Sequence, residues 1–353
     1  MILSQLRIHQ FRNISTVEIY PIEKFNIFYG LNGSGKTSLL EAIYYLGLNR
    51  SFRSHINNRI IQYEKENFQL YAKFGSLEVG LEKDIHKKTT LHINQQLANS
   101  ITEITKQLPI QLIDTQSYEF IDQGPEFRRQ LLDWGVFYVE HSFAALWKSY
   151  QICLQQRNSA IKQQLPIKEI LAWDEKLSQA GNKLTELRVS YITKLLPFLK
   201  ETLQQFTFFS ALSVDFKQGW PEAMSLEEAI KQSIHKDLQV GYTTLGPHRA
   251  DLVIKSNKIS LKDSLSRGEK KLLVMIVKIA QGKLLKQLKN LTTLYLIDDL
   301  SSEVDKFKQA QIMELLEDLA MQYFITTINK LIFNEYANTT QLFHVEQGNI
   351  VID

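Results

Sequence analysis

The residues best suited to chemistry lie in one short glycine-rich segment, residues 30–37, which reads Gly-Leu-Asn-Gly-Ser-Gly-Lys-Thr. Its spacing matches G-x-x-x-x-G-K-[ST], in which glycines let backbone N–H groups surround phosphate oxygens at the start of a helix. Lys36 would reach the β- and γ-phosphates, and the Thr37 hydroxyl would ligate Mg²⁺. This phosphate loop predicts a site for ATP and Mg²⁺. We expect its nucleotide contacts to come from Gly30, Leu31, Asn32, Gly33, Ser34, Gly35, Lys36 and Thr37.

Two aspartates follow the apolar run of residues 294–297, which is typical of a buried parallel strand. Asp298 can hold Mg²⁺ through its water shell, and Asp299 can orient or deprotonate the attacking water. The same residues also fit a strand that ends at the surface in a polar turn. The phosphate loop in the same chain favours the first interpretation. We therefore expect Asp298 to bind the metal with Thr37, and Asp299 to act in hydrolysis with Lys36.

Residues 265–269, Leu-Ser-Arg-Gly-Glu, open a predicted helix that precedes the aspartate strand. A serine followed by a glycine at a helix start offers a hydroxyl and backbone N–H groups to an anion. Serine is also a preferred helix-capping residue, so the segment by itself fits an ordinary helix start.

The elements that must position these residues alternate between strand and helix at both ends of the chain. Residues 24–29 predict an apolar strand that leads into the phosphate loop, and residues 36–46 predict the helix after it. Gly75 and Gly80 mark turns or bulges in the antiparallel strands that follow. Further strands are predicted at 2–11, 16–20, 68–83, 89–95, 109–113, 211–216, 250–254, 292–297 and 323–327, and in a hairpin at 342–352. Further helices are predicted at 268–288 and 306–319.

The middle of the chain is helical in character. Leucine and isoleucine recur there at helical spacing, interrupted by Pro166 and Pro197. The chain therefore predicts an α/β protein. Residues 1–124 and 211–353 form one head with a mixed sheet, and residues 125–210 form an all-helical lobe inserted in it.

The net charge of +3 is uninformative, but two segments are locally basic. Residues 247–289 hold eleven Lys and Arg against three Asp and Glu, a local net charge of +8. Residues 42–63 contain Arg50, Arg53 and Arg59 and no acid. Such runs fit either a solvated face or an anion-binding surface.

Cysteine content and hydropathy indicate the compartment. The single cysteine, Cys153, fits a small buried apolar residue in a reducing cytosol. The N-terminus shows no signal-peptide pattern, and the most apolar later stretch, residues 272–280, is too short to cross a bilayer. We expect a cytoplasmic protein with no membrane association.

The order of these motifs resembles the ABC ATPases. The phosphate loop is followed by a long insertion, an LSGGE-like signature at 265–269, the aspartate strand, and Ser-Ser-Glu-Val-Asp at 301–305, which is similar to a D-loop. The resemblance implies an ABC-type head in which the signature of one subunit covers the nucleotide of the other. Ser266 would then act in catalysis, Asp305 would lie near the nucleotide, and ATP would join a homodimer.

Further segments resemble the RecF family, whose members act in bacterial DNA repair. They span nearly the whole chain in the family's order. They are Phe-Arg-Asn at 11–13, the phosphate loop, Arg-Ser-Phe-Arg at 50–53, Arg-Arg-Gln-Leu-Leu-Asp-Trp-Gly at 128–135, Gly-Pro-His-Arg-Ala-Asp at 246–251, and Phe-His-Val-Glu-Gln-Gly at 343–348.

This resemblance implies ATP-driven dimerisation on double-stranded DNA at gaps or junctions, and cooperation with RecO and RecR in loading RecA. It also implies that Arg12 contacts a nucleotide phosphate, although Arg12 fits a surface arginine at a strand end as well. Arg50, Arg53 and Arg59 are candidate contacts to the DNA backbone.

Three positions depart from the usual patterns. Leu31 replaces the proline that is common in this loop. Asp299 stands where most ABC ATPases carry a glutamate and is one methylene shorter, which suggests slow hydrolysis suited to a switch. The usual switch histidine is absent, and Thr327 is the candidate replacement. Two other classes fit less well: the ATPase subunit of a membrane transporter, which would lack the inserted lobe, and a small-molecule kinase, which would lack the signature.

Overall fold

The computed structural model describes all positions of the chain except 55, 57, 58, 115, 116, 118, 207, 208, 210, 211, 257, 258, 301–305 and 353. The chain divides into two compact units. The first comprises Met1–Ser117, Arg267–Met275 and Lys289–Asp353, and the second comprises Tyr118–Ser266 and Ile276–Leu288. Helix α11 (Arg267–Lys289) contributes residues to both units.

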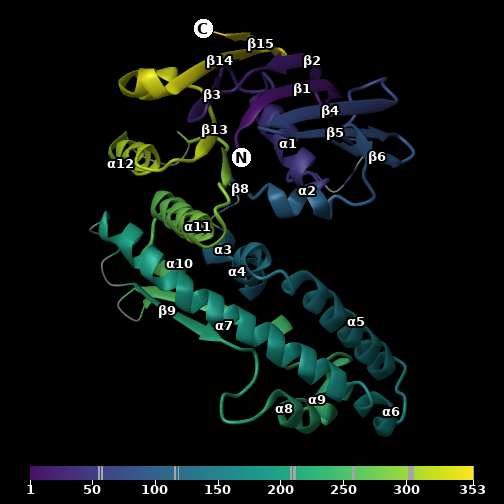
Figure 1. The fold of residues 1–353 in the computed structure, drawn as a ribbon. Helices are drawn as coiled ribbons and strands as arrows, with labels where there is room; N and C mark the ends of the chain where they lie inside the picture. The colour runs from purple at the N-terminus through teal and green to yellow at the C-terminus, as the bar shows by residue number, and fades with distance from the viewer. Residues whose placement is uncertain are drawn as a thin grey trace. The chain divides into compact units, whose positions relative to one another are not determined.

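The first unit contains a six-stranded antiparallel sheet in the order β2-β1-β4-β5-β6-β7 (Figure 1). Its strands are β1 (Leu3–Phe11), β2 (Ile14–Ile19), β4 (Asn67–Phe74), β5 (Leu77–Asp84), β6 (Thr89–Ile93) and β7 (Gln96–Leu97). Gly75 forms the predicted turn between β4 and β5, with φ of 61°. The prediction of a turn or bulge at Gly80 is wrong, because Gly80 continues β5 in regular register between Tyr71 and His92.

A second six-stranded sheet in this unit has the order β15-β14-β3-β13-β12-β8. Its strands are β3 (Phe25–Tyr29), β8 (Ile110–Ile113), β12 (Leu294–Ile297), β13 (Gln322–Thr327), β14 (Thr340–Glu346) and β15 (Asn349–Ile352). Only the β14–β15 pairing is antiparallel, so the mixed sheet and the α/β class are confirmed. Because β3, β12 and β13 are parallel neighbours, the segments that follow them meet at one edge of the sheet.

Helix α1 (Lys36–Leu48) contacts strands of both sheets (Figure 1). Its buried Leu39, Leu40 and Ile43 belong to one apolar cluster that includes Phe28 of one sheet and Leu70 of the other. The remaining helical elements of the unit are α2 (Thr102–Gln107), α12 (Lys306–Glu317) and η4 (Lys330–Thr339). The shared core fixes the start of α1 against the strand ends.

The second unit combines helices with a small sheet of order β11-β10-β9. The strands are β9 (Leu212–Lys217), β10 (Asp251–Ser256) and β11 (Ile259–Ser260). The helices are α3 (Glu119–Asp122), α4 (Pro125–Val139), α5 (Phe143–Lys162), α6 (Ile167–Leu171), α7 (Asp174–Gln204), α8 (Leu226–Gln232), α9 (Ile234–Val240), η3 (Pro247–Arg249) and α10 (Leu261–Ser264). The long helices α5 and α7 pack side by side (Figure 1).

Two features of this unit differ from the predictions. Pro197 lies inside α7 and does not interrupt it. Proline in a helix costs about 3 kcal/mol, but Leu195 and Leu199 on either side are buried, and each buried leucine contributes about 1.5–3 kcal/mol. The unit also extends beyond the predicted lobe of 125–210, because β10 packs on α4 and carries its sheet with the helices.

The interior of the second unit is joined by buried ion pairs. The Arg157 guanidinium donates to Asp174 at 2.8 Å and to Asp237 at 2.7 Å, and thereby connects α5, α7 and α9. Arg188 of α7 pairs with Asp133 of α4 at 2.8 Å. Cys153 is buried, as expected.

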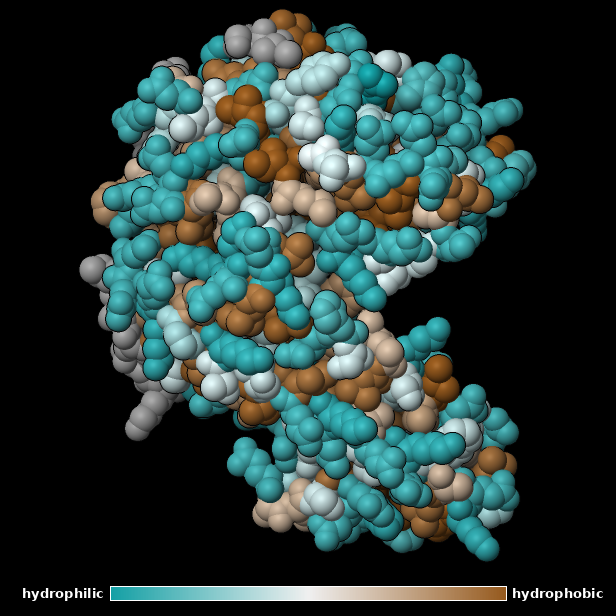
Figure 2. All heavy atoms as spheres, in the orientation of Figure 1, coloured by the Kyte–Doolittle hydropathy of each residue, from teal (hydrophilic) through white to brown (hydrophobic). Residues whose placement is uncertain are grey.

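Hydrophilic side chains cover most of the face shown in Figure 2, with hydrophobic side chains scattered in small groups among them. None of the helices in the described part of the chain combines the length and apolar composition that crossing a membrane requires.

Candidate nucleotide-binding site

The phosphate loop follows β3 directly and depends on glycine at two close approaches. Gly30 has φ of 148°, and a Cβ there would collide with the carbonyl oxygen of Val345 on β14. Gly35 has φ of 117°, and its Cβ would lie 2.9 Å from Nδ2 of Asn13. Both conformations are costly for residues with a side chain. The loop is therefore built for a backbone that passes close to its neighbours.

The start of α1 is open to an anion. Gly35 occupies the capping position without a side-chain cap, and the first turn carries no acidic residue. The first N–H groups of a helix lack intrahelical partners, and the helix dipole adds positive potential there. Asn13 supports the loop from β1's end, because its Nδ2 donates to the Ser34 carbonyl at 3.3 Å and its Oδ1 accepts from Ser38 at 2.9 Å.

Lys36 lies over the phosphate loop. Its Nζ donates to the carbonyl oxygens of Gly30 at 2.7 Å and Leu31 at 2.8 Å. Burial lowers the pKa of Lys36, while the charges of Asp299 and Asp298 act in the opposite direction. The ammonium is held by weak backbone acceptors that a phosphate would outcompete, because hydrogen bonds between two charged groups are the stronger kind.

Asp298 meets the phosphate loop at the end of β12. The Thr37 hydroxyl donates to its carboxylate at 3.0 Å and 3.2 Å, and the Thr326 hydroxyl of β13 donates to Oδ1 at 2.6 Å. Burial raises the pKa of the Asp298 carboxyl, and the two threonine hydrogen bonds act in the opposite direction. The predicted pair of Thr37 and Asp298 is thus brought together from distant parts of the chain.

Arg12 lies beside the pocket in a bidentate pair with a buried acid. Its Nη2 and Nε donate to the Glu41 carboxylate of α1 at 2.6 Å and 2.9 Å, and its Nη1 donates to the carbonyl of Arg59. Glu41 also accepts from Ser51 at 2.5 Å and lies 3.6 Å from Nη1 of Arg53. This network connects the end of β1 to the segment that carries the predicted DNA contacts.

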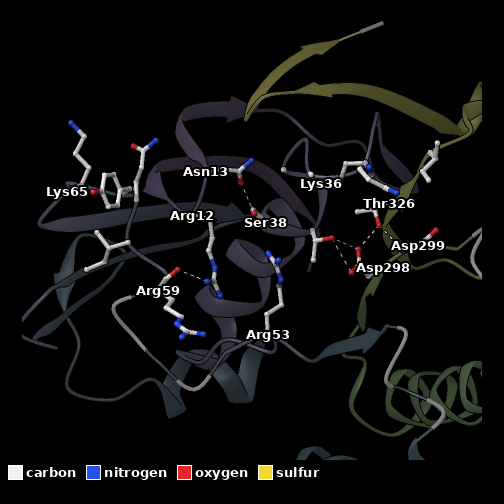
Figure 3. Close-up of a pocket in the computed structure, with 18 of the residues that line it drawn as sticks. Arg12, Asn13, Lys36, Ser38, Arg53, Arg59, Lys65, Asp298, Asp299 and Thr326 are labelled. Atoms are coloured by element: carbon white, nitrogen blue, oxygen red, sulfur yellow. Dashed lines mark hydrogen bonds between the residues drawn. The ribbon is translucent and has the colours of Figure 1, made fainter.

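These residues surround a cavity of about 1100 Å³ in the first unit (Figure 3). In this view Arg12 and Asn13 lie between Lys36 and the aspartates on one side and Arg59 and Lys65 on the other. Among the predicted nucleotide residues, Asn32, Gly33, Gly35, Lys36, Thr37 and Arg12 line it. Arg53 and Arg59 line it too, whereas Arg50 is exposed elsewhere on the surface.

The residues present fit ATP with Mg²⁺. Ser34 in the loop has a buried hydroxyl oxygen without a partner, which a phosphate oxygen would satisfy. Thr37 and Asp298 offer adjacent oxygen ligands of the kind that Mg²⁺ prefers. Among the described residues no group of three His, Cys, Asp or Glu side chains is placed to hold a metal. A metal here would therefore depend on phosphate oxygens as well, as is usual for Mg²⁺ with nucleotides.

The remaining predicted residues have different placements. Ser266 is exposed, belongs to the second unit and lies one residue before α11. Asp305 lies outside the described residues. Thr327 lines the cavity, but its hydroxyl takes part in a local turn with Asn329.

The basic run at 247–289 does not form one solvated face. Lys270 and Lys271 are buried, and Lys271 donates to the carbonyl of Asp299 at 2.7 Å. Lys283 pairs with Glu201 at 3.1 Å, and Arg249 stacks over the ring of Tyr242 at 5.0 Å. Several of its charges therefore serve the fold, and the run contributes less to an anion-binding surface than its net charge suggests.

Comparisons with known proteins agree with this fold. Residues 2–351 match the family described as RecF/RecN/SMC N terminal domain. The solved "Structure of the recombination mediator protein RecF-ATPrS in RecFOR pathway" superposes with a TM-score of 0.86 at 24% identity, covering 99% of this chain and 97% of that one. The "Crystal structure of the SmcHead bound to the C-winged helix domain of ScpA" superposes with a TM-score of 0.62 at 14% identity, covering 100% and 97%. Fold and site together define an ATPase of the RecF/RecN/SMC class.

Proteins of similar sequence show to which family within this class the chain belongs. The chain is 39% identical to the "DNA replication and repair protein RecF" of Coxiella burnetii (strain Dugway 5J108-111), covering 99% of this chain and 98% of that protein. It is 36% identical to the protein of the same name from Shewanella loihica, covering 100% and 99%. The chain belongs to the RecF family of DNA replication and repair proteins. This membership does not favour a transporter subunit.

Sequence reasoning missed three residues that organise the site: Glu41, Lys271 and Thr326. Each acts through a partner distant in sequence, namely Arg12, Asp299 and Asp298. The available signal was weak for all three. Glu41 is the one acid of α1 and stands among apolar residues, and Thr326 is a polar residue at the end of an apolar strand.

Proposed function

We propose that the protein binds ATP with Mg²⁺ in the cavity around Lys36, and that ATP joins two copies of the chain on double-stranded DNA. The observation that carries the nucleotide site is the junction of the phosphate loop with the strand end, where the Thr37 hydroxyl lies 3.0 Å from Asp298. A magnesium-nucleotide site needs this juxtaposition, and residues 261 positions apart provide it here.

The residues around the cavity would divide the chemistry among them. The loop N–H groups and the start of α1 bind phosphate oxygens, and Lys36 neutralises the β- and γ-phosphates. Thr37 and Asp298 would hold Mg²⁺, which would neutralise charge on those phosphates. Asp299 orients or deprotonates the attacking water. Its short side chain reaches less far than a glutamate, which supports slow hydrolysis that serves as a switch.

The second copy would complete the site. Ser266 lies directly before α11, and in this proposal its hydroxyl and the N–H groups at the helix start would bind an anion. A two-fold arrangement would place this signature against the γ-phosphate held by Lys36 and Thr37 of the other subunit. Asp305, in the D-loop-like segment, would lie at the same interface. ADP lacks the γ-phosphate, so hydrolysis would release the pair.

DNA is the proposed partner of the ATP-bound dimer. Exposed Arg53 and Arg59 beside the cavity, together with Arg50, are suited to the phosphate backbone rather than to base edges. Relatives named for DNA replication and repair, and a solved relative assigned to the RecFOR pathway, support double-stranded or gapped DNA as the substrate. From the family resemblance we also propose RecO and RecR as partners in loading RecA, and the cytoplasm as the place of action.

The test is nucleotide binding by two lysine variants of the first unit. Lys36→Ala should weaken ATP binding by about tenfold or more, because the loop loses the cation over the phosphates. Lys73→Ala is the control, since Lys73 is a half-buried cation on β4 that pairs with Glu78 and does not line the cavity. Unchanged ATP affinity in Lys36→Ala, measured by titration calorimetry, would remove the nucleotide assignment.

A further inference from the structure

The backbone of Asp299 is held in an unusual conformation. Its φ is 52°, in the left-handed region that residues with a Cβ adopt rarely. Aspartate tolerates this region better than most residues, but the conformation persists only where neighbours fix it. Two neighbours do so here, one on each side of the residue: Asp299 donates its N–H to Thr326 and accepts at its carbonyl from Lys271.

Thr326 serves both aspartates with one hydroxyl. Its Oγ1 accepts from the Asp299 N–H at 2.8 Å and donates to Asp298 Oδ1 at 2.6 Å. The carbonyl of Thr326 also accepts from the N–H of Leu300 at 3.2 Å. The residue is 1% exposed, so these bonds are largely shielded from bulk water. The end of β13 thus fixes the direction in which the chain leaves β12.

Lys271 holds the carbonyl side of the Asp299 backbone. Its Nζ donates to the Asp299 carbonyl at 2.7 Å, and the residue is 1% exposed. A buried ammonium is costly unless it is hydrogen-bonded. Lys271 stands near the start of α11, two residues after the end of the signature segment. This contact therefore links the helix that carries the signature to the acid at the strand end.

We propose that Lys271 and Thr326 are positioning residues that clamp the backbone of Asp299 on both sides of its Cα and so set where its carboxylate lies. The clamp controls the rate of hydrolysis and contributes little to the affinity for ATP, because neither contact involves the phosphate loop. This proposal rests on the proposed function, in which Asp299 orients or deprotonates the attacking water. Thr326 has a second effect that Lys271 lacks, because it also orients the carboxylate expected to hold Mg²⁺.

The experiment compares Lys271→Met, Thr326→Val and the double variant. Each single variant should lower kcat by about tenfold to a hundredfold, since small misplacements of a catalytic group have effects of that size. The Kd for ATP at saturating Mg²⁺ should stay within about twofold of the parent. The double variant should be about as slow as the slower single variant, because both changes release the backbone of the same residue.

Matched variants separate positioning from general damage. Thr293→Val makes the same change at a fully buried threonine whose hydroxyl oxygen has no partner, and it should leave kcat unchanged. Thr326→Ser keeps the hydroxyl and should restore most of the rate. Thr326→Val should also need more Mg²⁺ for half-maximal ATP binding, whereas Lys271→Met should not.

Three results would contradict the clamp. The first is an unchanged kcat in both single variants, and the second is a double variant whose fold-loss of kcat equals the product of the two single losses. The third is a fall in ATP affinity as large as the fall in kcat. Asp299→Asn distinguishes this failure from that of the proposed function. An active Asp299→Asn would remove the role of Asp299 itself. An inactive Asp299→Asn beside fully active Lys271→Met and Thr326→Val would remove only the clamp.

Discussion

Removing the Arg12 side chain should destabilise the first unit substantially, whatever Arg12 does for the nucleotide. Its guanidinium makes two hydrogen bonds to Glu41, at 2.6 Å and 2.9 Å. The Glu41 side chain is 0% exposed and that of Arg12 is 15% exposed. Arg12→Ala therefore leaves a carboxylate in the core with fewer donors.

The loss of unfolding free energy in Arg12→Ala depends on the partners that Glu41 keeps. Breaking a buried ion pair by removing one partner costs about 3–5 kcal/mol. Ser51 still donates to Glu41 at 2.5 Å and Arg53 lies 3.6 Å away, so we expect the lower end, about 3 kcal/mol. At about 2–4 °C per kcal/mol for a unit of this size, the melting temperature should fall by about 6–12 °C.

Thermal unfolding in the absence of nucleotide is the assay, read on the transition of the first unit. Arg12→Met with Glu41→Met removes both charges and should recover much of the loss, because no buried charge is left without a partner. Arg7→Ala is the control: it breaks an exposed pair between Arg7 of β1 and Glu18 of β2, and it should leave the transition nearly unchanged. A parental melting temperature for Arg12→Ala, or a double variant less stable than either single one, would refute this reasoning.

Three further predictions follow from the sites. Asp299→Asn should keep ATP bound but abolish turnover, and a parental rate of phosphate release would place the base elsewhere. Arg53→Ala and Arg59→Ala should each weaken duplex binding regardless of sequence and reduce the slope of log affinity against log salt by about one unit; binding independent of salt would contradict a backbone contact. Burial lowers the pKa of His248 to about 4 from its ordinary 6.5. Stability present above pH 6.5 should therefore be lost as the pH falls towards 4, because the unfolded chain takes up a proton that the folded chain does not. His248→Gln should flatten this dependence in melting curves at pH 7 and pH 5.

The phosphate loop and its flanking elements were predictable because their signals are local. An apolar strand, a glycine-rich turn and a helix occur within one stretch, and β3 and α1 form there as expected. The ends of β12 and β13 were also predicted closely, since continuous apolar runs are typical of parallel strands with both faces buried.

Other elements depended on contacts that a single stretch of sequence does not contain. Pro197 stays inside α7 because the packing of the whole helix compensates for one lost hydrogen bond. Gly80 stays inside β5 because strands on both sides hold its register.

Helix α8 was missed although its signal is local: Ser225 and Glu228 form a capping box at its start.

In the candidate site, too, residues with a local sequence signal could be predicted, and residues that act through distant contacts could not. Lys36, Thr37 and Asp298 could be named from motif spacing, and the structure brings Thr37 and Asp298 together. The partners that orient the acids could not be named, because Lys271 and Thr326 meet Asp299 only after α11 and β13 have packed beside β12. The sequence named Thr327 as a stand-in for the switch histidine and gave no sign that its neighbour Thr326 is the residue that bonds Asp298.

The central claim is that one ATP is held by the phosphate loop of one copy and the signature of another. The most direct test mixes Ser266→Arg with Lys36→Ala, each inactive alone, and measures the rate of ATP hydrolysis. A mixed dimer has one site with both defects and one site with neither, so hydrolysis should return on mixing. If mixed dimers form and hydrolysis stays absent, the signature does not act across the interface.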